Sequence, residues 1–161
     1  MADTLRDDFG WALSVVFRAF LKASNEAMGT LPGGPRGYQV LEASTRQPPV
    51  SQSVIAHEVG IDRTVMTYLL DDLEREGLLI RRPDPTDRRS RQVIATDHGV
   101  TRLGELRVLM ARVQDFVLRD LAEPDRDALR CLLRRAALRL DSLDPAALCN
   151  VVSDIEKAQR S

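Results

Sequence analysis

Hydrophobic residues near the start of the chain recur at alternating steps of four and three, the spacing of one face of an amphipathic helix. This pattern predicts a helix from about Thr4 to Met28. Trp11 and Val15 lie off the main stripe, so the helix has apolar surface on a second side. Glycines and prolines from Gly29 onward end it, and a short helix is expected from Arg36 to about Thr45. The main stripe consists of Phe9, Leu13, Val16, Phe20, Ala23 and Ala27.

The segment from Ser51 to Gly77 predicts two short helices joined by a tight turn. Ser51 is a suitable N-cap for a helix that runs through Val59, and Asp62 can cap a second helix over residues 63–76. Gly60 permits the turn, and Gly77 ends the second helix. This arrangement is typical of a helix-turn-helix. The side chains expected to face its core are Val54, Ile55, Ala56, Val59, Ile61, Met66, Leu69, Leu70 and Leu73.

The pattern then changes to that of two short strands, over residues 78–82 and 91–95, separated by a polar, proline-bearing tip. A hairpin directly after a helix-turn-helix, here called the wing, predicts a winged helix-turn-helix. Thr96 can cap a long helix to about Leu121, and a final helix follows Pro124. A last short helical stretch is expected from Asp144. The predicted fold class is therefore mainly α with a small β-hairpin wing, flanked by N- and C-terminal helices.

Composition narrows the class of protein. The chain has 161 residues, 43% of them hydrophobic and 29% charged, as in a soluble globular domain. Apolar runs of only a few residues predict no membrane span, and the polar, acidic N-terminus predicts no signal or transit peptide. Two cysteines make no disulfide framework, so a reduced, cytoplasmic setting is expected.

The charges are unevenly placed. A formal net charge of −1 speaks, by itself, against general affinity for nucleic acid. However, residues 81–91 hold five arginines and two aspartates, a local balance of +3, whereas residues 62–77 hold three aspartates and two glutamates against two arginines, a balance of −3. The near-zero total thus averages over a basic wing and an acidic second helix.

The segment from Ile55 to Ser90 resembles the MarR family of bacterial transcriptional regulators. The strong likeness covers about Ser51 to Gly99, and the flanking helices agree in number and order with the family. The most specific matches are Leu73-Glu74, Gly77-Leu78, Arg82-Pro83, Asp87-Arg88-Arg89, Thr96 and Gly99.

The resemblance implies an obligate homodimer that binds a pseudo-palindromic operator in double-stranded DNA. It implies a repressor released by a small lipophilic or phenolic effector, with no cofactor. Residues 1–35 and 100–161 would form the dimerisation region, and residues 36–99 the DNA-binding lobe. The leucine- and valine-rich terminal helices support the dimer independently, because so small a lobe cannot bury all of them.

The helix over residues 63–76 is the expected major-groove reader, with its N-terminal residues against base edges. Threonine hydroxyls can bond bases or phosphates, and threonine or valine methyl groups can contact thymine. Tyr68 can do either. The helix departs from the family pattern, which has arginine at position 68 and a basic residue at position 72, where this chain has tyrosine and Asp72. The candidate contacts on this helix are Arg63, Thr64, Val65, Thr67 and Tyr68.

Two further segments are candidates for DNA contact. The N-terminus of the helix capped by Ser51 can meet phosphate through the amides of Gln52 and Ser53. The resemblance assigns Arg89 to the minor groove and Asp87 to orienting it. In the same hairpin Arg88 and Arg91 are phosphate candidates, and Arg82 is either a phosphate contact or part of a structural ion pair. A solvated charged hairpin is the alternative interpretation of these residues.

The remaining candidates are weaker. The resemblance implies an effector pocket between the dimerisation helices and the winged lobe. Here it could be lined by Trp11, Val15, Tyr38 or Leu41, although all four could be ordinary core. Arginines flank Cys131, which would lower a thiol pKa, but a buried structural cysteine is the favoured interpretation there, and Cys149 is no stronger a candidate.

No metal or catalytic site is predicted. His57 and His98 lie far apart in the sequence, with His57 expected on the solvent side of its helix. The carboxylates Asp71, Asp72 and Glu74 lack a nearby nucleophile, which favours a solvated face over an enzyme. The acidic helix leaves one alternative function open, a winged-helix protein-interaction or architectural module without its own operator.

Overall fold

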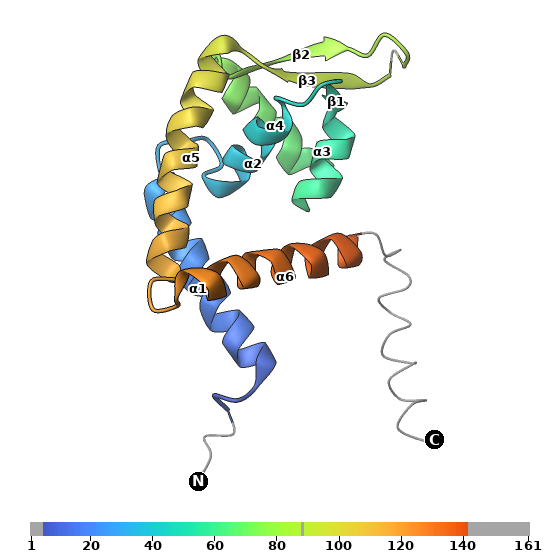
Figure 1. Ribbon diagram of the computed structural model, residues 1–161. Helices are drawn as coiled ribbons and strands as arrows, with labels where there is room; N and C mark the ends of the chain where they lie inside the picture. The colour runs from blue at the N-terminus through green and yellow to red at the C-terminus, as the bar shows by residue number, and fades with distance from the viewer. Residues whose placement is uncertain (1–4, 88, 142–161) are drawn as a thin grey trace, which may run out of the picture. The chain divides into compact units, whose positions relative to one another are not determined.

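The computed structural model describes residues 5–87 and 89–141. Within these residues the chain forms two compact units that divide between Arg119 and Asp120. Arg88, Cys149 and the helical stretch expected from Asp144 lie outside the described residues. The elements in chain order are α1 (Phe9–Ala27), α2 (Pro35–Ala43), β1 (Val50–Ser51), α3 (Gln52–Val59), α4 (Arg63–Arg75), β2 (Leu79–Pro83), β3 (Arg91–Ala95), α5 (Asp97–Val117) and α6 (Glu123–Asp141), as Figure 1 shows.

The sheet confirms the wing and adds a strand that sequence analysis missed. β2 and β3 pair antiparallel, from Leu79 opposite Ala95 to Pro83 opposite Arg91. β1 pairs with the other edge of β3, giving the strand order β1-β3-β2. Two residues are too few to show a strand period, and only the pairing with β3 makes them a strand. Because β1 leads directly into α3, this pairing holds the start of α3 beside the wing.

The core of the first unit lies between the helix-turn-helix, the sheet and α5. α1 packs along α5, and α2 packs against α3 and α5. The four predicted core positions of α4 are all buried, as are Ile55 and Ala56 of α3. Val54 was predicted to face inward but is 44% exposed, because it precedes Ile55 on the helix and turns away from the buried face. The fully buried larger side chains include Met28, Leu41, Ile55, Leu70, Leu73, Leu79, Leu103 and Leu106.

α5 begins in close contact with the end of the helix-turn-helix. The Thr96 hydroxyl accepts from the Gly99 amide at 3.0 Å, and donates to the Gly77 carbonyl at 2.6 Å. A Cβ on Gly99 would lie 1.9 Å from the carbonyl oxygen of Leu78. Only glycine fits this approach, which explains why glycine stands three residues after Thr96 in the motif.

Large apolar side chains remain exposed on α1 and α5. Phe9 at the start of α1 is 80% exposed, and Phe116 near the end of α5 is 58% exposed. The winged lobe therefore leaves much of the predicted apolar surface uncovered, in agreement with the sequence-based expectation. On α1 this surface comprises Phe9, Leu13, Val15, Val16, Phe17 and Leu21.

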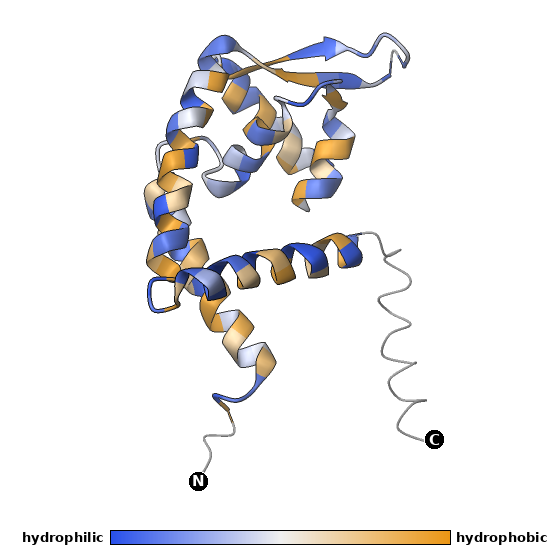
Figure 2. Cartoon of the chain, in the orientation of Figure 1, coloured by the Kyte–Doolittle hydropathy of each residue, from blue (hydrophilic) through white to orange (hydrophobic). Residues whose placement is uncertain are grey.

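α6, in the second unit, contains no buried residue among those described. Leucines alternate with arginines along it, as the hydropathy colours of Figure 2 show. Cys131 on this helix is exposed, so the expectation of a buried structural cysteine is wrong. That expectation rested on the general tendency of free cysteines to be buried, whereas here the neighbouring Leu132 and Leu133 are themselves 58% and 48% exposed.

Two further expectations concern the described residues as a whole. No helix in this part of the chain is long and apolar enough to cross a membrane. No cluster of histidine, cysteine, aspartate or glutamate within it could hold a metal ion. His57 is exposed on α3, as predicted.

Candidate nucleic-acid interface

The start of α3 is fixed by its cap. The Ser51 hydroxyl accepts from the Val54 amide at 3.3 Å and lies 2.9 Å from the Ser53 hydroxyl. The amides of a helix's first turn have no acceptor within the helix, so this end carries partial positive charge. Gln52 and Ser53 therefore stand at an end that favours an anion, although Ser51 itself serves as the cap.

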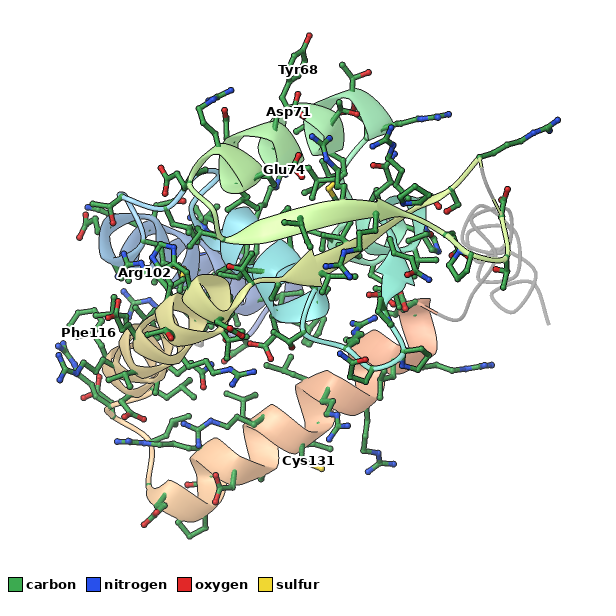
Figure 3. The ribbon with its side chains drawn as sticks, turned by 90° about the horizontal axis from the view of Figure 1, so that it is seen from above. Tyr68, Asp71, Glu74, Arg102, Phe116 and Cys131 are labelled. Atoms are coloured by element: carbon green, nitrogen blue, oxygen red, sulfur yellow. The ribbon has the colours of Figure 1, made fainter. Side chains whose placement is uncertain are left out.

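The turn and cap that follow set the direction of α4. Gly60 adopts the left-handed conformation, with φ of 66°, and ends α3. The Asp62 carboxylate then accepts from the amides of Thr64 at 2.9 Å and Val65 at 3.0 Å. The solvent-facing side of α4 presents Val65, which is 43% exposed, and Tyr68, which is 67% exposed. Figure 3 shows Tyr68 projecting away from the rest of the unit.

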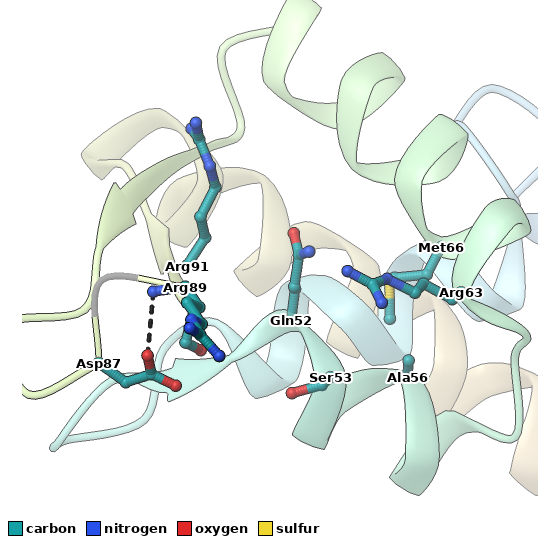
Figure 4. Close-up of a pocket in the computed structure, with 9 residues that line it drawn as sticks. Gln52, Ser53, Ala56, Arg63, Met66, Asp87, Arg89 and Arg91 are labelled. Carbon is teal, nitrogen blue, oxygen red and sulfur yellow. Dashed lines mark hydrogen bonds between the residues drawn. The ribbon is translucent and has the colours of Figure 1, made fainter.

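Two aspartates hold the tip of the wing in a defined conformation. One oxygen of the Asp84 carboxylate accepts from the Thr86 hydroxyl at 2.6 Å and the Thr86 amide at 2.8 Å, and the other accepts from the Gln92 side chain at 3.2 Å. These hydrogen bonds hold the pKa of Asp84 below its usual value. The Asp87 carboxylate accepts from the Arg89 backbone amide at 2.9 Å (Figure 4). Asp87 thus positions Arg89 through its main chain.

These three segments meet around one pocket of about 320 Å³ (Figure 4). α3 contributes Gln52 and Ser53, α4 contributes Arg63, and the wing contributes an aspartate and two arginines. Three arginines against one aspartate give the lining a net positive charge. The full lining consists of Gln52, Ser53, Ala56, Arg63, Met66, Asp87, Arg89, Ser90 and Arg91.

The structure brings six of the candidate DNA-binding residues together in this pocket. Thr64, Val65, Thr67 and Tyr68 are exposed on α4 beside the pocket, and Arg82 is exposed on β2. Within the described residues, no carboxylate lies within ion-pairing distance of the guanidinium groups of Arg63, Arg82, Arg89 and Arg91. Their charges are thus available to a ligand.

Arg81 is a structurally important residue of the wing that sequence analysis missed. Its guanidinium donates to Asp71 at 2.6 Å and to Glu74 at 2.6 and 3.0 Å, and its side chain is only 18% exposed. Because strand residues alternate in direction, Arg81 lies on the same side as buried Leu79, whereas Arg82 points the other way. Arg81 therefore makes the structural ion pair that was considered for Arg82.

This ion pair also changes the electrostatics of α4. Asp71 and Glu74 are paired with Arg81, and Asp72 pairs with Arg75 at 2.6 Å. Arg81 thus offsets one unit of the acidic excess of this helix, and three of its acids are held in ion pairs.

Comparison with known proteins identifies the family. Residues 35–90 match the family model described as MarR family. The chain is 34% identical over 131 residues to a putative transcriptional regulatory protein for the hcr operon of Thauera aromatica, a match that covers 81% of this chain and 76% of the relative. The chain belongs to the MarR family of transcriptional regulators.

Solved structures agree with this assignment to the MarR family. The transcriptional repressor CouR bound to a 23-mer DNA duplex is 30% identical with a TM-score of 0.74, covering 85% of this chain and 97% of that one. CouR from Rhodococcus jostii RHA1 bound to p-coumaroyl-CoA is 27% identical with a TM-score of 0.70, covering 84% and 96%. The winged helix-turn-helix fold of this MarR-family protein is thus shared along most of the chain.

The four candidate effector residues of this MarR-family protein lie in different environments. Leu41 is completely buried, Trp11 and Tyr38 are half-buried, and Val15 is 37% exposed. Burial and the nearby Glu42 carboxylate raise the pKa of Tyr38. These residues do not line the interface pocket. They also do not line a second cavity, which lies between the α1–α2 connector and the end of α4 and is lined by Gly29, Thr30, Leu31, Pro32, Asp72, Arg75 and Glu76.

The Arg81 ion pair predicts a pH-dependent contribution to stability. The Arg81 guanidinium holds the pKa of Glu74 below its usual value. A lowered carboxyl pKa stabilises the fold above the pKa of the unfolded chain, and this contribution is lost as the pH falls through the folded pKa. Arg81→Met should therefore lower the free energy of unfolding by about 1 kcal/mol near neutral pH, a value discounted for the solvent exposure of Glu74.

The measurement is urea unfolding of wild type and Arg81→Met at neutral pH and at about pH 3.5. The difference in the free energy of unfolding between the two proteins should be smaller at the lower pH. Arg82→Met is the matched control, because it removes the neighbouring cation and leaves the ion pair intact. An equal effect of both substitutions at both pH values would contradict the assigned role of Arg81.

Proposed function

We propose that this protein is a homodimeric transcriptional repressor that binds a pseudo-palindromic operator and leaves it when a small lipophilic or phenolic effector binds. The observation that carries the proposal is the cationic pocket, in which α3, α4 and the wing bring together six candidate DNA-binding residues. The CouR repressor, similar along most of its length, was solved bound to a DNA duplex. No catalytic activity is part of the proposal, and we expect the protein to act in the cytoplasm, with the DNA.

The proposed DNA contacts divide by element. α4 enters the major groove with Thr64, Val65, Thr67 and Tyr68 toward base edges. Arg89 enters the minor groove, where negative potential is concentrated. The phosphate contacts come from the first turn of α3, at Ser51, Gln52 and Ser53, and from Arg63, Arg82, Arg88 and Arg91.

We propose that the protein forms a homodimer because the winged lobe leaves a large apolar surface uncovered. Residues 1–35 and 100–161 form the dimerisation region, and residues 36–99 form the DNA-binding lobe. Exposed apolar side chains such as Phe9, Val16 and Phe17 on α1 form a patch that a soluble monomer rarely leaves in water. A second copy of the chain would bury it.

The effector proposal is supported by CouR, which was solved with p-coumaroyl-CoA bound. In this chain the proposed effector contacts are Trp11, Val15 and Tyr38, which have exposed surface, and Leu41, which is fully buried. A phenolic ring would suit a pocket lined by these aromatic and aliphatic side chains.

Selection of bound sequences from random DNA, followed by footprinting, tests the proposed function. We expect a discrete pseudo-palindrome with centres of protection about one helical turn apart. Weak binding to all sequences, or to none, would instead favour a winged-helix interaction or architectural module without its own operator. The acidic half of α4 prompted that alternative, and its acids are largely engaged in pairs with Arg75 and Arg81.

A further inference from the structure

The exposed face of α4 has an unusual chemistry for a helix that reads DNA. Residues 64–72 include no arginine, lysine, asparagine or glutamine, the side chains that bond base edges in pairs of hydrogen bonds. The exposed positions are instead two threonines, Val65 and Tyr68. The carboxylates of Asp71 and Asp72 are partly exposed, but they are engaged in ion pairs with Arg81 and Arg75. This face therefore offers methyl groups, one aromatic ring and single hydroxyl groups.

One of the two threonine hydroxyl groups is further restricted by a contact within the helix. The Thr67 hydroxyl donates to the Arg63 carbonyl at 2.9 Å, so its proton is already used. What Thr67 offers a base is an acceptor and a methyl group. Val65, at 43% exposure, offers only methyl groups, and Tyr68, at 67%, offers mainly its ring.

The cation at the start of α4 does not change this picture. Arg63 lines the pocket with Arg89 and Arg91, and Figure 4 shows its guanidinium extending from α4 into that pocket. This direction suits a phosphate contact. Asp62 adds a negative charge at the same end of the helix, where its carboxylate caps the amides of Thr64 and Val65.

The exposed face of α4 suits some base edges in the major groove better than others. Guanine presents two acceptors in the major groove, which are best matched by a side chain with two donors. Thymine presents a methyl group, which matches valine, threonine methyl and aromatic surfaces. We infer that α4 selects thymine through its 5-methyl group, with Val65 and Tyr68 as the specificity-determining residues, so that the bases read by α4 in each half-site are A·T pairs. This inference rests on the proposed function, because it requires α4 to enter the major groove.

Replacing thymine by deoxyuracil tests the inference, because it removes only the methyl group. In the operator obtained by selection, each thymine of a half-site is replaced singly and Kd is measured by fluorescence anisotropy at fixed salt. At one or more positions per half-site we expect Kd to rise about four-fold for each methyl removed from contact. The same replacement in the flanking DNA, outside the footprint, is the control and should leave Kd unchanged.

Protein variants link the methyl groups to named residues. For Val65→Ala, the ratio of Kd with deoxyuracil to Kd with thymine should be close to one at the position that Val65 contacts. At the other sensitive positions this ratio should stay as it is for the wild type. Tyr68→Phe removes only the hydroxyl and should retain the methyl sensitivity, whereas Tyr68→Ala should lose it at its position. Both side chains are exposed, so thermal melting should be unchanged in all three variants.

The possible outcomes separate the inference from the proposed function. A discrete palindrome with G·C pairs at the positions of α4, or one whose Kd is unchanged by deoxyuracil, would overturn the thymine reading and leave the repressor proposal standing. The absence of any discrete site would overturn both.

Discussion

Replacing Arg89 with alanine should weaken operator binding by on the order of 100-fold, because a dimer that binds as proposed loses two minor-groove contacts, each worth about 1–3 kcal/mol. Arg89 is exposed at the wing, lines the interface pocket, and has its backbone amide held by the Asp87 carboxylate at 2.9 Å. No carboxylate among the described residues pairs with its guanidinium, so no internal contact competes with DNA.

The same substitution should change the salt dependence of binding. Each cation removed from the DNA contact reduces the magnitude of the slope of log K against log salt by about 0.9. Because a dimer loses two cations, the magnitude of its slope should fall by about two. Electrophoretic mobility shift assays across a series of salt concentrations measure both quantities. Arg36→Ala, at an exposed arginine of α2 outside the proposed DNA contacts and dimerisation region, is the matched control and should change neither. Unchanged affinity and slope for the Arg89 variant would remove the wing from the proposed interface.

Gly99→Ala should be strongly destabilising, by on the order of 3 kcal/mol, because the added methyl group has no room. Its Cβ would lie 1.9 Å from the Leu78 carbonyl oxygen and 3.3 Å from the Leu41 side chain. A backbone carbonyl cannot turn aside as a flexible side chain does. Relief therefore requires α5 to move away from the base of the wing, which would also break the hydrogen bonds of Thr96.

Gly104→Ala provides a control on the same helix. A Cβ at Gly104 would meet nothing within 4 Å, and alanine favours helix over glycine by about 1 kcal/mol. The two substitutions are chemically identical and should act in opposite directions on the thermal midpoint, as measured by circular dichroism. If Gly99→Ala melted at the same temperature as the wild type, the close contact between α5 and Leu78 would be wrong.

The helix-turn-helix was predictable because its signals are local. Ser51 and Asp62 are caps whose hydrogen bonds form within three residues, and Gly60 supplies the one left-handed residue of the turn. The apolar spacing of α4 then fixes which side is buried. Such features depend on neighbouring residues in the sequence, and the structure reproduces them with boundaries shifted by at most one residue.

Features that depend on distant partners were not predictable in this way. β1 is a strand only because Val50 and Ser51 pair with Val93 and Gln92. Arg81 and Arg82 look equivalent as adjacent charges in the wing, yet Arg81 is committed to Asp71 and Glu74. Two signals could have distinguished them: the alternation of the strand, and the three-residue spacing that places both acids on one face of α4.

The candidate interface shows the same division. The pattern of residue types identified the basic wing and the exposed face of α4, but it could not show that Arg63 belongs with the wing arginines in one pocket. That grouping depends on the pairing of β1 with β3 and on the packing of α4 against α3, and the β1–β3 pairing has no counterpart in local spacing.

The two attachments of the wing constrain the spacing of the DNA contacts within one half-site of the operator. β1 joins the wing to the start of α3, and Arg81 joins it to α4. For a dimer bound as proposed, the interval between the major-groove bases read by α4 and the minor groove entered by Arg89 is therefore set by the lobe itself. Inserting a base pair within a half-site should therefore abolish binding. The distance between the two lobes of the dimer is not fixed in this way, so a rearrangement of the dimer on effector binding would change the spacing between half-sites that the protein can bind.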